Sequence, residues 1–577
     1  MLSKIGSFLR KNPVLIVVVL AGFLLRSFAT ESTPPSLNWD EVSHGYNAFS
    51  ILTTGKDEWG KTLPLIFRVF GDYKLPVYIY ITAISESVFG LTSFAVRLPS
   101  ILAGASLILL TYLLTIEIFH NKKYAYIAAV LVAVEPWSLF LSRGAFEANL
   151  ATAFFLLGVY LFMVGVKRSR PALLTSIVAF GLTVWTYNSF RIFTPLMLCV
   201  LVFLYRKEIL RNIWVDKNFS IRAATIFLVM FLPMLWQLLM PVGQVRYGKV
   251  AIVDAGAIAQ IENSRNSSPY PAVLSRLLFN RVTFFWKGFL ANWISHYSGD
   301  FLFFRGGTNY QFSVPGWGLI YLIELPTVIL GLACLIKKRT KEAVLLLLWF
   351  YFAPIPSSIT REAPHVLRSI TMLPMPMIFS AVGLVVISDW LKKRFKFPQK
   401  LAYILFFVTI AFLLKGYLTS YFGSYRETYS WSWQYGYKQV VAYAKVNYSK
   451  YDKILITKRY GEPYEYVLFY WPVNSNDYQN DPNLVRFYKS NWYWVDSFDK
   501  FYFLNDWEIS SKSSWSIPRS LDDENVFKLE SGGEVNCHTS SAKCLLVTSP
   551  GNVPNNWKKL ETISFLNKQP AFEMYSN

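Results

Sequence analysis

The feature that most constrains this chain is a series of long apolar segments between Val14 and Phe422. A helix needs about 20 predominantly apolar residues to cross the roughly 30 Å hydrocarbon core of a bilayer, and stretches of this kind recur along this part of the sequence. The composition agrees, because 53% of the residues are hydrophobic and only 16% are charged. Soluble domains carry about 25% charged residues. The sequence therefore predicts a polytopic α-helical membrane protein.

The net charge of +21 is the one bulk property that could indicate nucleic-acid binding. The basic residues fall in short clusters between the apolar segments, however, and they do not form one stripe of the kind that follows a phosphate backbone. Lysine and arginine are enriched in the cytoplasmic loops of membrane proteins. We therefore interpret the clusters as topology signals and expect no nucleic-acid partner.

Two topologies are compatible with the apolar segments, and they differ over residues 76–90. If this segment lies along the membrane interface, every strong basic cluster falls on the inner side. The segment is short and carries Ser85, Glu86 and Ser87, which are costly in lipid. We predict eleven spans, with the N-terminus inside, the C-terminus outside and interfacial helices in the first outer loop. The predicted spans are 13–30, 94–119, 123–142, 146–166, 172–190, 192–205, 221–240, 317–336, 342–355, 369–388 and 401–422.

This topology divides the chain into a transmembrane domain, residues 1–422, and a C-terminal domain, residues 423–577. The transmembrane domain has two long outer loops, 31–93 and 241–316. In the C-terminal domain, residues 431–445 resemble a loop that leads into an amphipathic helix. Three apolar runs between polar turns predict strands, so we expect a small extracytoplasmic α/β domain. These runs are 454–457, 465–470 and 545–548.

Two cysteines of the C-terminal domain, Cys537 and Cys544, flank a polar turn. An extracytoplasmic location would allow a small disulfide, and a reduced pair fits the sequence as well.

The first polar loop begins with 36-SLNWDEVSHGY-46. Ser36 or Asn38 can cap a helix that ends before Gly55. We expect the aromatic face of this helix in the membrane interface and its polar face directed outward. A solvated polar face would show the same pattern, so the helix alone does not define a site. The residues of the polar face follow the spacing i, i+3, i+4 and i+7 and are Asp40, Ser43, His44 and Asn47.

Further ionisable residues fall on the predicted outer side. A lone arginine at the end of a span is usually an interfacial anchor, but several ionisable groups on one face predict a polar cavity. Guanidinium groups bind phosphate oxygens in a bidentate fork, and a carboxylate on a preformed helix suits a general base. These types together predict transfer of a group from a lipid-linked phosphate to an outside acceptor. The residues are Asp72, Lys74, Arg143, Glu147, Arg191, His365 and Arg368.

A divalent metal is a possible cofactor, because aspartate, glutamate and histidine are common ligands. No tight spacing such as H-x-x-x-H accompanies them. The sequence therefore assigns no cofactor.

The order of these motifs resembles the GT-C membrane glycosyltransferases, in particular the protein O-mannosyltransferases and the bacterial aminoarabinose lipid A transferase (glycosyltransferase family 39-like). NWDEVSHG followed by DYKLP resembles the first outer loop of that group, and 97-RLP-99 resembles the start of its next span. Arg143 and Glu147 match an R-x-x-x-[DE] element in the second outer loop. The resemblance covers roughly residues 10–420 and is strongest over 36–150.

The resemblance implies a GT-C fold and an inverting transfer of a hexosyl or pentosyl group from a polyprenyl-phosphate sugar. It implies that Asp40 is the catalytic base and that Glu147 is an acidic residue near the reacting sugar. Lys74 stands where the protein mannosyltransferases have histidine, and residues 241–316 are too few for their central loop domain. The acceptor can therefore be a lipid, a glycan or a protein. The implied substrate-binding residues are Glu41, His44, Asp72, Lys74, Arg143, Arg191, His365 and Arg368.

Two other classes of function remain open at this point. A transporter or flippase of lipid-linked sugars would place its binding residues near the midplane, where Glu324 is the best candidate. A polymer ligase would use the same lipid carriers. Because the ionisable residues gather on one face, we favour a multi-pass glycosyltransferase of the cell (plasma) membrane whose site faces outward. Its expected partners are the polyprenyl-phosphate donor, membrane lipid and the acceptor.

Overall fold

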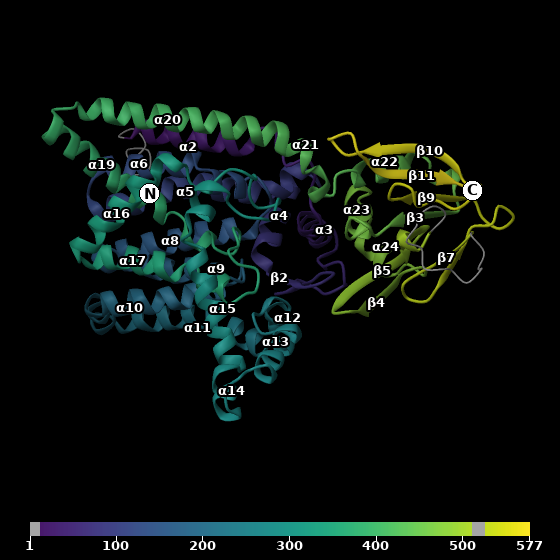
Figure 1. Ribbon diagram of the computed structural model, residues 1–577, viewed down its shortest axis with the longest axis horizontal. Coiled ribbons are helices and arrows are strands. Elements are labelled where there is room, and N and C mark those ends of the chain that lie inside the picture. Colours follow the sequence, from purple (N-terminus) through teal and green to yellow (C-terminus); the bar gives the residue numbers. More distant parts are fainter. Residues whose placement is uncertain (1–11, 510–524) are drawn as a thin grey trace. The chain divides into compact units, whose positions relative to one another are not determined.

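The computed structural model describes residues 12–509 and 525–577 (Figure 1). These residues form two compact units. Unit 1 comprises the chain up to Phe28 together with Ser100–Ser420, and unit 2 comprises Ala29–Pro99 together with Tyr421–Asn577. The first polar loop therefore folds with the C-terminal segment of the chain. The predicted domain boundary after residue 422 and the predicted side of the membrane stay predictions.

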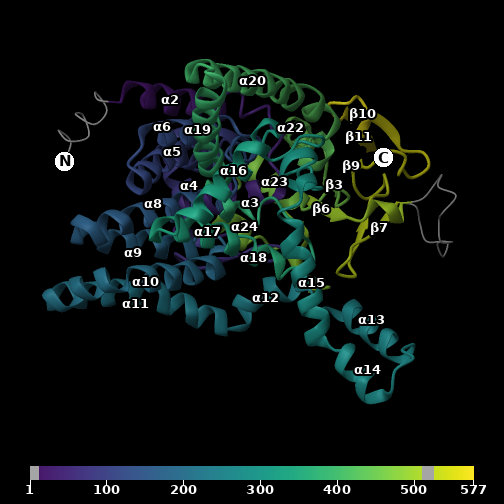
Figure 2. The ribbon, with the colours of Figure 1, turned by 60° about the vertical axis from the view of Figure 1, so that its left-hand side comes forward.

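Each of the predicted span ranges holds at least one helix, although the bounds differ, and α16 begins only at Leu325 within the range 317–336. Figure 2 shows how these helices lie in unit 1. They are α2 (Pro13–Ser27), α5 (Ser93–Phe119, which begins in the residues of unit 2), α6 (Lys122–Val134), α7 (Pro136–Leu141), α8 (Glu147–Arg168), α9 (Arg170–Val184), α10 (Phe190–Val215), α11 (Lys217–Leu239), α16 (Leu325–Lys338), α17 (Lys341–Phe352), α19 (Met375–Phe395) and α20 (Gln399–Ser420).

Within the described residues, five helical stretches are long and apolar enough to cross a membrane. They are Ser93–Phe119, Glu147–Arg168, Lys217–Leu239, Ile370–Phe395 and Gln399–Thr428. Two shorter apolar helices, α2 and α9, accompany them. The chain is thus a helical membrane protein, while the count of eleven spans and their orientation stay predictions.

Two predicted spans differ from their helices for local reasons. The predicted span 123–142 is broken between α6 and α7, because Pro136 has no backbone N–H and occupies the first turn of the second helix. The apolar part of the predicted span 192–205 is short, but the helix that contains it is longer. Its helix, α10, continues to Val215, with a kink at Tyr205.

The segment that the sequence predicts along the interface, residues 76–90, forms α4 (Pro76–Phe89) of unit 2. This helix has 14 residues and so extends about 21 Å, which is too short to cross a hydrocarbon core of about 30 Å without further residues.

Helices α16 and α19 pack backbone against backbone through two glycines. A Cβ atom at Gly383 of α19 would lie 1.8 Å from the carbonyl oxygen of Thr327, and one at Gly331 of α16 would lie 1.9 Å from that of Phe379. The hydroxyl groups of Thr327 and Ser380 are 2.7 Å apart and hydrogen-bond between the helices. Small residues and hydroxyl pairs of this kind drive helix association where lipid removes the hydrophobic effect.

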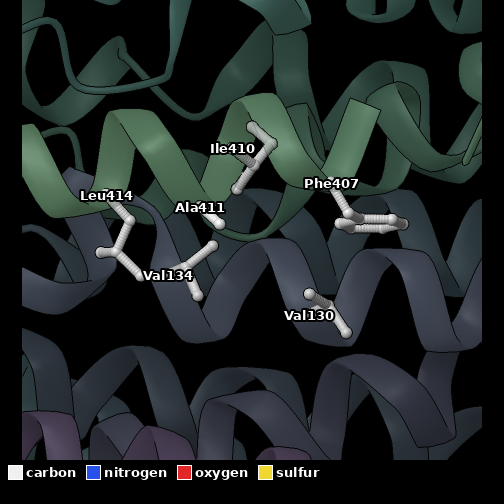
Figure 3. A pocket seen from close by; sticks show the side chains of 6 residues that line it. All are labelled: Val130, Val134, Phe407, Ile410, Ala411 and Leu414. Atoms are coloured by element: carbon white, nitrogen blue, oxygen red, sulfur yellow. The ribbon is translucent and has the colours of Figure 1, made fainter. Parts of the chain in front are cut away.

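A shallow apolar groove runs between α6 and α20 (Figure 3). Its lining has no charged side chain, so the groove suits hydrocarbon better than a polar substrate. The residues that line it are Val130, Val134, Phe407, Ile410, Ala411 and Leu414.

Unit 2 is built on a seven-stranded sheet with the strand order β10-β11-β9-β3-β6-β5-β4. The central strand β3 pairs in parallel with β6 and β9, and the other pairs are antiparallel. The strands are β3 (Lys453–Thr457), β4 (Val485–Lys489), β5 (Trp492–Phe498), β6 (Phe501–Leu504), β9 (Cys544–Thr548), β10 (Lys558–Ser564) and β11 (Pro570–Ser576).

The central strand is buried on both faces, since Ile454, Leu455 and Ile456 have no exposed surface. Parallel pairing requires such a continuous apolar run. The predicted strands at 454–457 and 545–548 are therefore confirmed as β3 and β9, and the predicted helix within 431–445 is confirmed as α22 (Tyr437–Val446).

The predicted strand at 465–470 is wrong, because these residues belong to α23 (Pro463–Tyr470). Pro463 stands at the first helical turn, where its fixed φ favours a helix. Short apolar runs have no periodicity that separates a buried strand from a buried helix.

Of the two alternatives for Cys537 and Cys544, the structure forms the disulfide.

We expect Gly383→Ala to lower the melting temperature of the purified protein, because the new Cβ cannot fit beside the Thr327 carbonyl without separating α16 from α19. Overpacking of this kind costs about 1–3 kcal/mol. The matched control is Gly248→Ala, where a Cβ meets nothing within 4 Å and the change should be neutral or slightly stabilising. Equal melting temperatures for the two variants would contradict the close packing.

Candidate functional site

The first helix of unit 2, α3 (Trp39–Thr54), begins with a capping box. The Asn38 side chain accepts a hydrogen bond from the backbone N–H of Glu41 at 2.9 Å, and the Glu41 carboxylate accepts one from the backbone N–H of Asn38 at 3.0 Å. Reciprocal capping satisfies two backbone donors at once and fixes where the helix starts. Asp40 lies in this first turn, so its position is set by the cap.

Glu41 is also half of a buried ion pair with Arg97 of the RLP element. Two parallel hydrogen bonds of 2.8 Å join the groups, and neither side chain has any exposed surface. Arg97 further donates to the carbonyl oxygens of Thr30, Pro34 and Ser36, at distances of 2.5–3.2 Å. One guanidinium therefore ties the entry of the loop to the first turn of α3.

This pair changes how two sequence motifs are interpreted. The resemblance implies that Glu41 contacts substrate, whereas the structure places this side chain fully inside the protein with Arg97 and Asn38. The RLP motif predicts that Arg97 lies at the start of a span. The motif does not predict that Arg97 pairs with Glu41.

Asp40 has the opposite environment. Its side chain is 51% exposed and its Oδ1 lies 2.5 Å from the Nζ of Lys74, which is 9% exposed. Lys74 lies in a short β-hairpin whose strands have two residues each. In this hairpin β1 (Phe67–Arg68) pairs with β2 (Tyr73–Lys74). Asp72 lies in the turn of this hairpin, where its Oδ1 accepts from the backbone N–H of Tyr73 at 2.7 Å. The structure thus brings three predicted residues, Asp40, Asp72 and Lys74, to one side of unit 2.

The rest of the polar face of α3 is buried, so Ser43, His44 and Asn47 do not form a solvated face. His44 lies inside with its ring 5.0 Å from that of Tyr78. Burial, with a smaller contribution from the charge of Lys74, holds the pKa of His44 well below its usual range. His44 is therefore a neutral imidazole beside the Asp40–Lys74 pair.

A cluster of buried acids in unit 2 was not found from the sequence. Asn47 donates to Glu58 at 3.1 Å, and the hydroxyl of Tyr464 contacts Glu58 at 3.4 Å and Glu465 at 3.3 Å. Burial raises the pKa of Glu58 to about 7 and raises the pKa of Glu465 well above its usual range. Burial also raises the pKa of Glu462 to about 8. Nothing in the spacing of these residues distinguishes them from surface acids.

The remaining predicted residues belong to unit 1, where two arginines bind backbone at helix ends. Arg143 donates to the carbonyl oxygens of Leu25 at 2.6 Å and Phe28 at 2.6 Å, at the C-terminal end of α2. Arg191 donates to the carbonyl oxygen of Val184, at the end of α9, at 3.2 Å. A cation at a helix C-terminus is favourable because the unpaired carbonyl groups carry partial negative charge.

Glu147 is the first residue of α8 and is partly exposed. It lies four residues beyond Arg143, and the residues between them are not helical. An acid in the first turn suits the positive end of a helix, so this residue also has a local structural role.

His365 and Arg368 lie on a segment anchored by a buried histidine, His296. The Nδ1 of His296 lies 2.7 Å from the Asn292 carbonyl oxygen, and since a carbonyl only accepts, Nδ1 carries the proton. Its Nε2 then accepts from the backbone N–H of His365 at 3.3 Å. Burial lowers the pKa of His296 to about 4, in agreement with a neutral ring.

Arg368 is held by side chains of its own segment. It donates to the hydroxyl of Thr360 at 2.8 Å and to the carboxylate of Glu362 at 2.7 Å. Its side chain is 11% exposed and that of Glu362 is 60% exposed. The guanidinium therefore has one neutral and one solvent-facing anionic partner, which an entering anion could replace.

Within residues 12–509 and 525–577, no group of three or more histidine, cysteine, aspartate or glutamate side chains is arranged to hold a metal ion. The structure accordingly assigns no residues to a divalent metal.

Comparison with known proteins agrees with the resemblance read from the motifs. Residues 74–236 match the family model of dolichyl-phosphate-mannose-protein mannosyltransferases. The match begins at Lys74 and includes Arg97, Arg143, Glu147 and Arg191. The predicted resemblance to this group of GT-C glycosyltransferases is confirmed. A comparison with curated protein sequences finds no significant match.

Among solved structures, ArnT from Cupriavidus metallidurans in the apo state is similar over 98% of this chain and 98% of its own, with 12% identity and a TM-score of 0.50. ArnT bound to undecaprenyl phosphate gives 12% identity and a TM-score of 0.48, over 99% of this chain and 98% of that chain. The likeness to apo ArnT supports a GT-C-like helical fold with a C-terminal sheet.

The archaeal oligosaccharyltransferase AglB from Archaeoglobus fulgidus, in complex with an inhibitory peptide and a dolichol-phosphate, shares 14% identity over 81% of this chain, with a TM-score of 0.48. This chain spans 64% of the length of that protein.

Removal of one partner of the Glu41–Arg97 pair should be strongly destabilising. We expect Arg97→Gln to lower stability by about 3–5 kcal/mol, because it leaves a buried carboxylate without its cation. The double variant Glu41→Gln/Arg97→Gln should recover part of that loss, since no buried charge remains. Melting temperature in detergent is the measurement, with Lys74→Gln as the control at a partly exposed pair. A double variant less stable than Arg97→Gln would show that unpaired charge is not the cause.

The buried acids predict a pH dependence of unit 2. Folded Glu58 and Glu462 have pKa values of about 7 and about 8, above the value of 4.5 expected when unfolded. The folded state therefore binds more protons, so stability should be highest at acidic pH and fall between about pH 4.5 and about pH 8. In Glu462→Gln this fall should be smaller, whereas the exposed Glu427→Gln should behave as wild type. Melting curves from pH 5 to pH 8 test both, and identical slopes would contradict the burial of Glu462.

Proposed function

We propose that this protein transfers a sugar from a polyprenyl-phosphate-linked donor to an acceptor at the outer face of the membrane, with Asp40 as the catalytic base. The proposal rests on the family match of residues 74–236 and on the environment of the first turn of α3. The family match supports the class of glycosyltransferase, and the geometry of the first turn of α3 supports the role of Asp40.

The observation that carries the assignment is the contrast between the two adjacent carboxylates of α3. Glu41 has no exposed surface and is held by Arg97 and Asn38, whereas the side chain of Asp40 is 51% exposed. A general base must reach the proton that it removes. Asp40 meets this condition and Glu41 does not.

Lys74 supports the same role. Its contact of 2.5 Å with Asp40 orients the carboxylate, and its ammonium group suits the phosphate of a lipid-linked donor. Neutral His44 lies inside beside this pair and adds no competing positive charge. Asp72, in the turn of the hairpin that carries Lys74, is the further acidic residue proposed on this side of unit 2.

The proposed reaction is an inverting displacement. The carboxylate of Asp40 accepts the proton of the acceptor hydroxyl as that oxygen bonds to the anomeric carbon of the sugar. The bond from this carbon to the phosphate oxygen breaks, and the polyprenyl phosphate leaves with the electron pair. Cations stabilise the negative charge that the phosphate gains.

The predicted residues of unit 1 keep their proposed roles. Arg143, Arg191, His365 and Arg368 are proposed contacts of the donor phosphate, and Glu147 is a proposed acid near the reacting sugar. Arg368 is the best supported, because its anionic partner Glu362 faces solvent and could be displaced. Glu41 is proposed to act indirectly, because its capping interaction and its ion pair with Arg97 hold the helical turn that carries Asp40.

The test is sugar transfer from a panel of radiolabelled polyprenyl-phosphate sugars to a crude envelope acceptor, with purified protein in detergent. Asp40→Asn should keep the wild-type melting temperature and lose about 10²–10⁴ of the rate, the range typical of a lost general base. The matched control is Glu31→Gln, an exposed acid of the same loop.

Each other outcome has a defined meaning. Full activity of Asp40→Asn would remove it as the base and make Glu147→Gln the next variant. Tight binding of a donor without turnover in the wild type would favour a transporter or flippase of lipid-linked sugars. Transfer of a preassembled glycan in place of a single sugar would identify a polymer ligase.

A further inference from the structure

The outer loop of unit 1 that follows α11 carries the helix α15 (Arg281–Ser295). This helix exposes several large apolar side chains. None of its residues is fully buried, although the segment reads RVTFFWKGFLANWIS. In a water-exposed helix the polar side chains lie outward and the apolar ones face the core. Here the exposed side chains include large apolar ones together with Arg281, Thr283 and Lys287.

The exposed stripe of α15 is continuous. Its side chains recur every fourth residue and are each more than half exposed, and at about 100° per residue they fall within one sector of about 120°. Arg281 and Lys287, both exposed, lie on either side of this sector. The stripe consists of Val282, Trp286, Leu290 and Ile294.

The opposite side of α15 holds the polar contacts. Asn292 donates to the carbonyl oxygens of Ser358 at 3.3 Å and Thr360 at 2.8 Å. His296, at the end of the helix, contacts the hydroxyl of Ser357 at 2.8 Å. The helix is therefore fixed to the segment that carries His365 and Arg368, and its apolar stripe faces away from the protein.

The neighbouring helix α14 (Ala272–Leu278) extends the apolar surface, and Figure 2 shows α13 (Ala255–Asn266) and α14 projecting from the helices of unit 1. The exposed residues of α14 include Arg276 together with four large apolar side chains. These are Val273, Leu274, Leu277 and Leu278.

Three observations identify what covers this surface. The loop leaves α11, a candidate span whose own last turns expose Leu235, Trp236 and Leu239, so the apolar surface continues from a lipid-facing helix. α15 has 15 residues and extends about 22 Å, too short to span the membrane. Basic residues flank an apolar stripe that includes Trp286 and Leu290, which is the pattern of helices that lie in the interface of anionic bilayers.

We propose that α14 and α15 form a lipid-binding surface that lies in the membrane interface at the C-terminal end of α11. The stripe of α15 enters the acyl region, and Arg281 and Lys287 contact the phosphates of anionic headgroups. Because Asn292 and His296 tie the helix to the 357–369 segment, lipid binding holds His365 and Arg368 at the level of the headgroups. This inference does not depend on the proposed sugar transfer.

The experiment uses the full chain in proteoliposomes that contain anionic phospholipid. Cys199 and Cys334, which are not in the disulfide, are replaced by serine, and a nitroxide is attached to Trp286→Cys, Leu290→Cys or Ala291→Cys. Ala291 is exposed on the polar side of the same helix and serves as the matched control. Collision rates with oxygen and with a water-soluble nickel chelate report the depth of each label.

For the labels at positions 286 and 290, the ratio of the collision rate with oxygen to that with the nickel chelate should be several-fold higher than for the control. These labels should lie about 5–10 Å below the phosphates. Arg281→Gln/Lys287→Gln should make them shallower, and more so in anionic than in zwitterionic lipid. Nickel accessibility equal to that of position 291 would overturn the proposal. Labels shielded from both reagents would replace lipid by a protein partner, and dipolar broadening between labels would identify a second copy of this chain.

Discussion

The candidate site depends first on one buried ion pair, Glu41 with Arg97. Two charges with no access to solvent are tolerated only when their hydrogen bonds are satisfied, and here Asn38 and three backbone carbonyl groups complete the arrangement. The pair joins the start of α5 to the first turn of α3. It therefore fixes the position of the first turn of α3. In this turn the side chain of Asp40 is 51% exposed and its Oδ1 lies 2.5 Å from the Nζ of Lys74. A specific geometry follows from an interaction that contributes little net stability by itself.

The same helix has two electrostatic environments along its length. Its first turn carries the solvent-accessible Asp40–Lys74 pair, whereas Asn47, two turns later, contacts the buried acid cluster of Glu58 and Glu465. Burial raises the pKa of both acids and so favours their protonated forms. The exposed Asp40, which is the proposed base, and the buried acids thus differ in solvent access and not in residue type.

In unit 1 the predicted cations differ in the partners that they already have. Arg143 and Arg191 bind carbonyl oxygens at the ends of helices, whereas Arg368 shares a solvent-facing carboxylate. The segment of Arg368 is tied through His296 and Asn292 to a helix whose exposed side is apolar. The depth of that helix in lipid would then set the depth of the cation. A membrane protein can in this way use the bilayer surface as a reference plane for a polar group.

The amino-acid sequence alone predicts the membrane class, the helical segments, the resemblance to the GT-C glycosyltransferases, the β3 and β9 strands and the candidate residues Asp40 and Lys74. These follow from hydropathy, from basic clusters and from local patterns, all of which act over a few residues. The tertiary structure shows in addition that Glu41 pairs with Arg97, that the polar face of α3 is buried, that residues 463–470 are helical and that α15 exposes an apolar stripe. The ion pair and the burial patterns depend on contacts with residues distant in the sequence, whereas a short apolar run such as that of α23 has no periodicity that separates a helix from a strand.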